Sequence, residues 1–153
     1  MSDTPLELSR DQRRKDLKHN WGIDCECSLC RGTEIEILDS EGRRRHMGEL
    51  GQTLSEAKQN GFYKDAAQIA KDLLQFSEWE SIPLLEPEHH DTLAELYFLD
   101  KDIVNAVKYA RMAMDGWVRF GSVDDTEVER ARVFLKKVEE MEDEINKAKY
   151  GLK

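Results

Sequence analysis

Three cysteines, Cys25, Cys27 and Cys30, lie within six residues near the start of the chain and are its only cysteines. An odd number of thiols at such short spacing suits a disulfide framework poorly. In a reducing compartment these thiols are available as thiolates, soft ligands that suit the tetrahedral coordination of Zn²⁺. The spacing C-x-C-x-x-C therefore predicts a zinc site with three thiolate ligands. The alternative is a chance cluster of buried cysteines.

The fourth ligand decides what such a site does, because structural zinc is normally held by four. His19 is near enough in sequence to be considered, although the bulky Trp21 separates it from the cysteines. A ligand from elsewhere fits better. The histidines and carboxylates are not arranged as in a zinc protease or deaminase, and neither a nucleophile–base pair nor a phosphate-binding loop is visible. We therefore expect no catalytic residue in this chain.

A basic helix is expected just before the cysteines, after a loop over residues 1–8. Ser9 and Gln12 have the spacing of a capping box, which predicts a helix from Ser9 to about His19. The helix is either a solvated surface or a patch that docks on something acidic. Its cationic side chains are Arg10, Arg13, Arg14, Lys15 and Lys18.

Beyond the cysteines the apolar residues recur at helical spacing. Glycines at 42, 48 and 51 weaken the pattern over residues 33–60, so regular helices are expected from about residue 44. We expect turns near Gly61 and Lys101 and a prolyl loop over 80–90. The last helix is predicted to start after Asp125. Its expected inward positions are Val128, Ala131, Leu135, Val138, Ile145 and Ala148.

A helix hairpin is used at least twice, because the pattern from Gly61 recurs at Lys101, an offset of 40 residues. The second copy resembles a tetratricopeptide (TPR) repeat, in which small residues let two helices approach closely; core packing explains the same residues without any ligand. The predicted fold is all-α, with TPR-like antiparallel hairpins over 33–153 and an N-terminal cysteine-rich zinc segment over 1–32. The residues that carry the resemblance are Leu93, Ala94, Tyr97, Ala106, Ala110 and Ala113.

The order of these segments is more specific than any one of them. A basic helix, an aromatic-Gly-apolar-x-C-x-C-x-x-C segment and TPR-like hairpins together resemble the region after the SET core in SMYD-like protein lysine methyltransferases. The resemblance covers nearly the whole chain. It implies that Cys25, Cys27 and Cys30 share zinc with a fourth cysteine in the SET core, near its Asn-His motif.

The same resemblance implies a role beside the cofactor S-adenosylmethionine. In the family, the residues just before the cysteines line the target-lysine channel and pack on the adenine. Trp21 matches an aromatic of that stretch, which makes it a candidate cofactor-binding residue, whereas Ile23 stands where an aromatic is common. The alternative is that Trp21 only anchors the zinc segment to the helices.

The parts that perform methyl transfer in the family have no counterpart here. There is no Asn-His-x-Cys segment, and none of the 24 residues before Cys25 is a tyrosine. We therefore expect a C-terminal fragment or truncated product that contributes a zinc segment and a helical substrate- or partner-binding region and is not catalytic alone. The alternative is a stand-alone TPR-like protein-interaction module.

Composition limits the partners and the location. The net charge of −9 disfavours direct binding to nucleic acid or anionic membranes. No run approaches the roughly 18 apolar residues of a membrane span, and the N-terminus lacks a signal-peptide core, so we expect an intracellular protein of nucleus or cytoplasm. The expected partner is a protein or peptide, including a SET core. Gln52 and Thr92, amid many acids, argue against a groove that grips peptide carboxylates.

Overall fold

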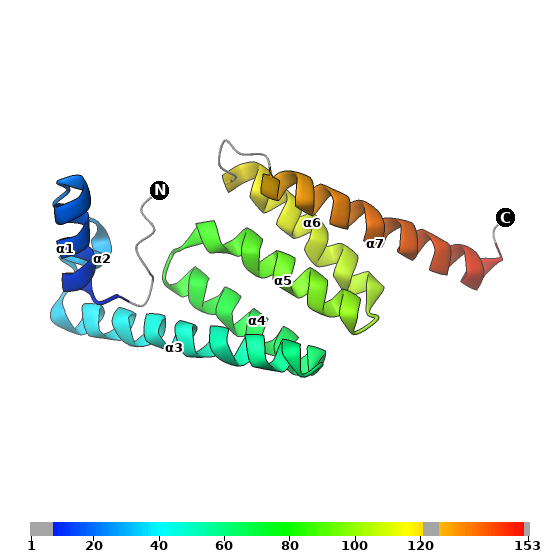
Figure 1. Ribbon diagram of the computed structural model, residues 1–153, viewed down its shortest axis with the longest axis horizontal. Coiled ribbons are helices and arrows are strands. Elements are labelled where there is room, and N and C mark those ends of the chain that lie inside the picture. Colours follow the sequence, from blue (N-terminus) through cyan, green and yellow to red (C-terminus); the bar gives the residue numbers. More distant parts are fainter. Residues whose placement is uncertain (1–7, 121–125, 152–153) are drawn as a thin grey trace. The chain divides into compact units, whose positions relative to one another are not determined.

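The computed structural model describes residues 8–120 and 126–151, which form helices and turns with no strand (Figure 1). This confirms the all-α class. The chain divides into two compact units, residues 1–52 and 53–153, called here the N-terminal and C-terminal units. The predicted domain boundary at residues 32 and 33 stays a prediction. The helices are α1 Arg10–Trp21, α2 Ser28–Arg31, α3 Glu34–Gln59, α4 Tyr63–Trp79, α5 Glu86–Leu99, α6 Ile103–Phe120 and α7 Thr126–Tyr150, with a 3₁₀ turn η1 Pro83–Leu85.

The start of α1 follows the predicted capping box. The backbone N–H of Gln12 donates to Ser9 Oγ at 3.3 Å, and the Gln12 side chain accepts from the Ser9 backbone N–H at 3.1 Å. These bonds satisfy donors that a helix start leaves unpaired. The helix continues to Trp21, two residues beyond the predicted end.

α3 begins at Glu34, ten residues before the expected onset of regular helix, so that expectation was wrong. A second capping box starts it: the Thr33 backbone N–H donates to Glu36 Oε2 at 2.7 Å, and the Glu36 N–H donates to Thr33 Oγ1 at 3.3 Å. Each glycine costs a helix about 1 kcal/mol. Helix growth is cooperative, so 26 residues from a well-capped start absorb that cost.

The hairpin repeat has a physical basis in its turns. Gly61 has φ +76° and Lys101 has φ +68°, so equivalent positions adopt the left-handed conformation. The Phe62 backbone N–H donates to the carbonyl of Ala57 at 2.9 Å, and that of Asp102 donates to Tyr97 at 2.9 Å. Both are the long hydrogen bond that closes a helix end before the chain reverses. The predicted turns at Gly61 and Lys101 are therefore confirmed.

The segment 80–90 is not the open loop that its prolines suggested. After α4 the chain turns through Ser81, forms η1, and enters α5 at Glu86. Pro87 lies in the first turn of α5, where its missing N–H costs nothing and its fixed φ favours the helix. Pro87 therefore marks the start of a helix and not a loop.

Small residues bring the helices of the C-terminal unit together. α5 packs against α4 and α6, and α6 packs against α7. One core cluster joins α4 to α5, with Leu54 and Ala57 of α3 packed against it, and a second joins α5, α6 and α7 through Val107 and Val138. The alanines at the contacts are fully or almost fully buried: Ala66, Ala67, Ala70, Ala94, Ala106, Ala110 and Ala113.

The inward face of α7 is shorter than predicted. Ala131 and Val138 are buried as expected, and Val128 and Leu135 are half-buried. Ile145 and Ala148 are exposed, so their predicted inward position was wrong. All side chains from residue 143 to 150 are exposed, which shows that the end of α7 extends past the helices it packs on. Within the described residues, no helix combines the length and apolar character needed to cross a bilayer.

Candidate metal centre

A glycine turn delivers the chain from α1 to the cysteines. Gly22 has φ +67°, a backbone conformation that side chains disfavour, and its N–H donates to the carbonyl of Lys18 at 3.0 Å. The next N–H, of Ile23, reaches back to Leu17 at 3.2 Å. This ending stops the helix and turns the chain toward Cys25. The glycine after Trp21 is therefore required by the backbone.

A single helical turn then folds the cysteines together. The Cys30 backbone N–H donates to the carbonyl of Cys27 at 2.9 Å, which brings the two side chains to one side. The sulfur atoms of Cys25, Cys27 and Cys30 all lie within 4.8 Å of one another. The cysteine cluster predicted from the sequence is thus present in the folded chain.

This cluster fits a zinc ion. Zn–S bonds of about 2.3 Å in tetrahedral geometry place sulfurs about 3.8 Å apart, so the thiolates need to close by no more than about 1 Å. Cys30 is buried, Cys25 is half-buried and Cys27 is exposed, so the site is open on one side. Among the described residues, no histidine or carboxylate joins the group. His19, considered as a ligand from the sequence, lies outside it.

The pKa values of Cys27 and Cys30 are shifted in opposite directions. Burial, with the hydrogen bonds and charges of the neighbouring thiols, raises the pKa of Cys30 to about 12. Burial also acts to raise the pKa of Cys27, but hydrogen bonds from the Cys30 backbone N–H and from its neighbours outweigh burial and lower it. Metal binding must therefore displace a firmly held proton from Cys30, so affinity for a metal rises with pH.

Arg13 brings a positive charge to this cluster. Burial and the charge of Arg44 lower the pKa of Arg13, against the attraction of Cys30, Glu41 and Cys27. Its guanidinium also donates to the carbonyl of Leu8. The sequence placed Arg13 in a basic patch but did not connect it to the cysteines, because that approach depends on how α1 folds back on α2.

Trp21 is 60% exposed and Ile23 is 50% exposed, directly before the cluster. Neither is part of a core cluster among the described residues. The predicted cofactor contact of Trp21 stays a prediction. Two large apolar side chains thus lie exposed directly before the cysteine cluster.

The C-terminal unit carries a groove that the sequence indicated only in part. Thr92 lies in it among acidic residues, whereas Gln52, predicted on the same face, is not among the described residues that line it. The contributions of Asp91, Arg130 and Phe134 were missed, because α5 and α7 meet only in the tertiary structure. The available signal was the spacing of Glu88, Asp91 and Glu95, which places three carboxylates on one helix face.

Comparison with protein-family models, with curated proteins and with solved structures finds no match for this chain.

Proposed function

We propose that Cys25, Cys27 and Cys30 hold a structural zinc ion whose fourth ligand comes from outside this chain. The observation that carries the proposal is the convergence of three sulfurs within 4.8 Å, with no fourth ligand in the described residues. Zinc supplies a fixed crosslink between the segments that ligate it. The residues of this chain supply three thiolates and, through Arg13, a balancing positive charge.

On this basis the chain acts as the post-SET zinc segment and C-terminal TPR-like region of a SMYD-like protein lysine methyltransferase. The SET core supplies the fourth thiolate and binds S-adenosylmethionine, and Trp21 packs at that junction. The exposed Trp21 and Ile23 support a covering partner here. The repeated hairpin, with its equivalent turns at Gly61 and Lys101, supports the TPR-like helical region, which binds a protein or peptide. The chain is not catalytic alone.

Cobalt substitution tests the fourth ligand. Thiolate-to-Co²⁺ charge-transfer absorption grows with the number of bound thiolates. The absorption of the chain alone should therefore correspond to three bound thiolates. A capped peptide containing Asn-His-Ser-Cys should raise the count to four, and the same peptide with serine for cysteine should not. A scrambled cysteine peptide is the matched control. Equal action of the scrambled peptide would mean that any thiol fills the site and would remove the support for a SET core.

Methyl transfer provides an independent test. The chain incubated with labelled S-adenosylmethionine and histone peptides should give no transfer above a protein-free control. Transfer that is abolished by Trp21→Ala would contradict the proposal, because it would place a complete active site within this chain.

A stand-alone interaction module is the second candidate. The groove in the C-terminal unit favours it, because a partner-binding surface needs neither zinc nor a SET core. In that case the cysteine cluster only caps the helices. The cobalt experiment separates the two, since a stand-alone module gains no thiolate from the Asn-His-Ser-Cys peptide beyond what the scrambled peptide supplies.

A further inference from the structure

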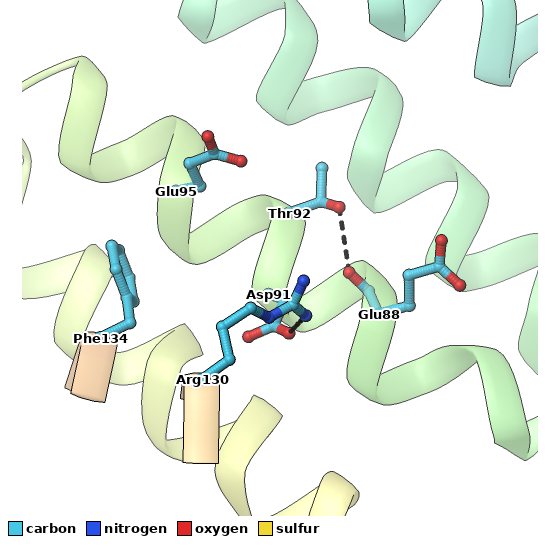
Figure 2. A pocket seen from close by; sticks show the side chains of 6 residues that line it. All are labelled: Glu88, Asp91, Thr92, Glu95, Arg130 and Phe134. Atoms are coloured by element: carbon cyan, nitrogen blue, oxygen red, sulfur yellow. Dashed lines mark hydrogen bonds and ion pairs between the residues drawn. The ribbon is translucent and has the colours of Figure 1, made fainter. Parts of the chain in front are cut away.

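A groove of about 400 Å³ lies between α5 and α7 in the C-terminal unit (Figure 2). α5 and α7 each pack against α6, and the groove lies between them. α7 contributes Arg130 and Phe134 to its lining, and α5 contributes the rest. The residues from α5 are Glu88, Asp91, Thr92 and Glu95.

The α5 wall of the groove is acidic. The Thr92 hydroxyl donates to the Glu88 backbone carbonyl at 3.0 Å, so it is committed to its own helix. Glu95 forms an ion pair with Lys58 at 2.6 Å. Glu88 has no ion pair within the part of the chain that the structure describes. The α5 wall therefore carries more negative charge than its paired cations neutralise.

Asp91 is the fixed acceptor at the centre. Its side chain is 18% exposed, and its Oδ2 accepts from Trp117 Nε1 at 2.7 Å and from Arg130 Nη2 at 2.6 Å. The indole of Trp117 comes from α6 and holds the carboxylate in place. Arg130 is 60% exposed and also contacts Glu127 at 2.7 Å. The groove thus holds a nearly buried anion, fixed by Trp117, that is paired with an exposed cation.

The α7 side adds an apolar surface. Phe134 packs edge-on against Phe98, with ring centroids 5.8 Å apart, which fixes its ring at the groove. Val133 is 61% exposed and lines a more open hollow that shares Arg130 and Phe134 with the groove. Such a surface suits the methylene stems of lysine and arginine as well as an aliphatic side chain.

We propose that this groove binds a basic segment of a partner protein. One lysine or arginine of the segment takes the place of Arg130 on Asp91, and a neighbouring aliphatic side chain packs on Phe134 and Val133. Arg130 is 60% exposed, so it returns to solvent when it is displaced, and the incoming cation replaces it as the ion-pair partner of Asp91. The net charge of −9 attracts a basic partner at long range.

The proposal deepens the partner-binding role given above to the helical region, and it does not depend on zinc. No cysteine lies in residues 53–153, so a failed groove leaves the cobalt result untouched and a failed zinc site leaves the groove untouched. The surface is matched to lysine and arginine, not to peptide carboxylates.

The test is fluorescence anisotropy with the full chain and a labelled, capped peptide Gly-Lys-Leu-Lys-Arg-Gly. Asp91→Asn should weaken binding by about fivefold or more. Arg130→Gln should instead tighten binding about threefold, because it frees Asp91. The matched control is Arg132→Gln, which removes the same charge from an α7 arginine that pairs with Glu129.

The test depends on Asp91→Asn and Arg130→Gln changing the peptide affinity in opposite directions. Equal tightening by Arg130→Gln and Arg132→Gln would mean that only overall charge matters and would overturn the proposal. Because Asp91→Asn also loosens Trp117, Glu88→Gln is a second variant on the exposed rim and should weaken binding about twofold. A peptide with glycine for leucine should bind more weakly. Equal binding of that peptide, or no binding of the leucine peptide to wild type and Arg130→Gln, would contradict the proposal.

Discussion

At the scale of single residues, Arg13 links the basic helix α1 to the cysteine cluster. Three thiolates around Zn²⁺ leave one negative charge, and a nearby guanidinium offsets it. Arg13 is half-buried with Cys30 and Cys27 within its electrostatic reach, whereas Arg14 on the same helix is exposed. The two arginines differ in environment but not in charge.

Arg13→Gln should therefore lower zinc affinity about three- to fivefold, an effect reduced by solvent screening. Arg14→Gln should change it less than about twofold. Affinity is measured by chelator competition at fixed salt. Equal effects of the two substitutions would show that Arg13 acts only through net charge.

His89 joins α4 to α5 and gives the fold a pH dependence. The buried hydroxyl of Ser77 donates to the Leu73 carbonyl at 3.0 Å and accepts from His89 Nε2 at 2.9 Å. Burial, with a smaller contribution from His90, lowers the pKa of His89 to about 4. The folded state thus favours the neutral ring.

A lowered histidine pKa means that stability is complete above about pH 6.5 and falls as the pH drops toward 4. His89→Gln keeps a donor for Ser77 but cannot be protonated. Between pH 7 and pH 4 the wild type should lose on the order of 2 kcal/mol more unfolding free energy than this variant. Parallel pH profiles from urea unfolding would contradict the assignment.

At the scale of elements, the two hairpin turns differ in one respect. Both need a left-handed residue, but one has Gly61 and the other has Lys101 at φ +68°. A side chain in that conformation costs about 1 kcal/mol. Lys101→Gly should raise the unfolding free energy by about that amount, and the control Lys101→Ala should not, because it keeps the strain. A gain of the same size from alanine would place the cost in the lysine side chain.

Two helical glycines should respond in opposite directions to alanine. A methyl group at Gly42 in α3 would meet nothing within 4 Å, so Gly42→Ala should stabilise by about 0.5–1 kcal/mol. At Gly116 in α6 the methyl group would lie 2.7 Å from Cγ of Pro87, a rigid ring. Gly116→Ala should therefore destabilise by about 1–3 kcal/mol. Thermal unfolding of the two variants measures these changes in stability. A shift of the unfolding temperature in the same direction for both would contradict the close α5–α6 contact at Gly116.

These elements also show what sequence reasoning can reach. The capping box at Ser9 was recognised, whereas the equivalent one at Thr33 was overlooked in favour of the glycines that follow it. Local pattern predicts where a helix can start, but the balance between a good cap and poor interior residues is decided over the whole helix. The exposure of Ile145 likewise could not be predicted from the sequence, because it depends on how long the neighbouring helices are.

At the scale of the whole molecule, the two units carry separate sites. The cysteine cluster belongs to the N-terminal unit, and both apolar core clusters belong to the C-terminal unit. Spacing alone predicted the cysteine cluster, since its members are five residues apart at most. The groove needed the tertiary structure, since Asp91 and Arg130 come from different helices. The zinc binding and the partner binding proposed above can thus be tested separately in one chain.

Zinc affinity, measured by competition with a chromophoric chelator, tests the three-cysteine site directly in the wild type, Cys27→Ser and the neighbouring control Ser28→Ala. The wild type should bind one zinc ion, more weakly than a four-ligand structural site, because one position is left to water. Cys27→Ser should lower the affinity by more than about 100-fold, and Ser28→Ala should leave it unchanged. Tight binding that survives Cys27→Ser would show that these cysteines are not the site and would contradict the account.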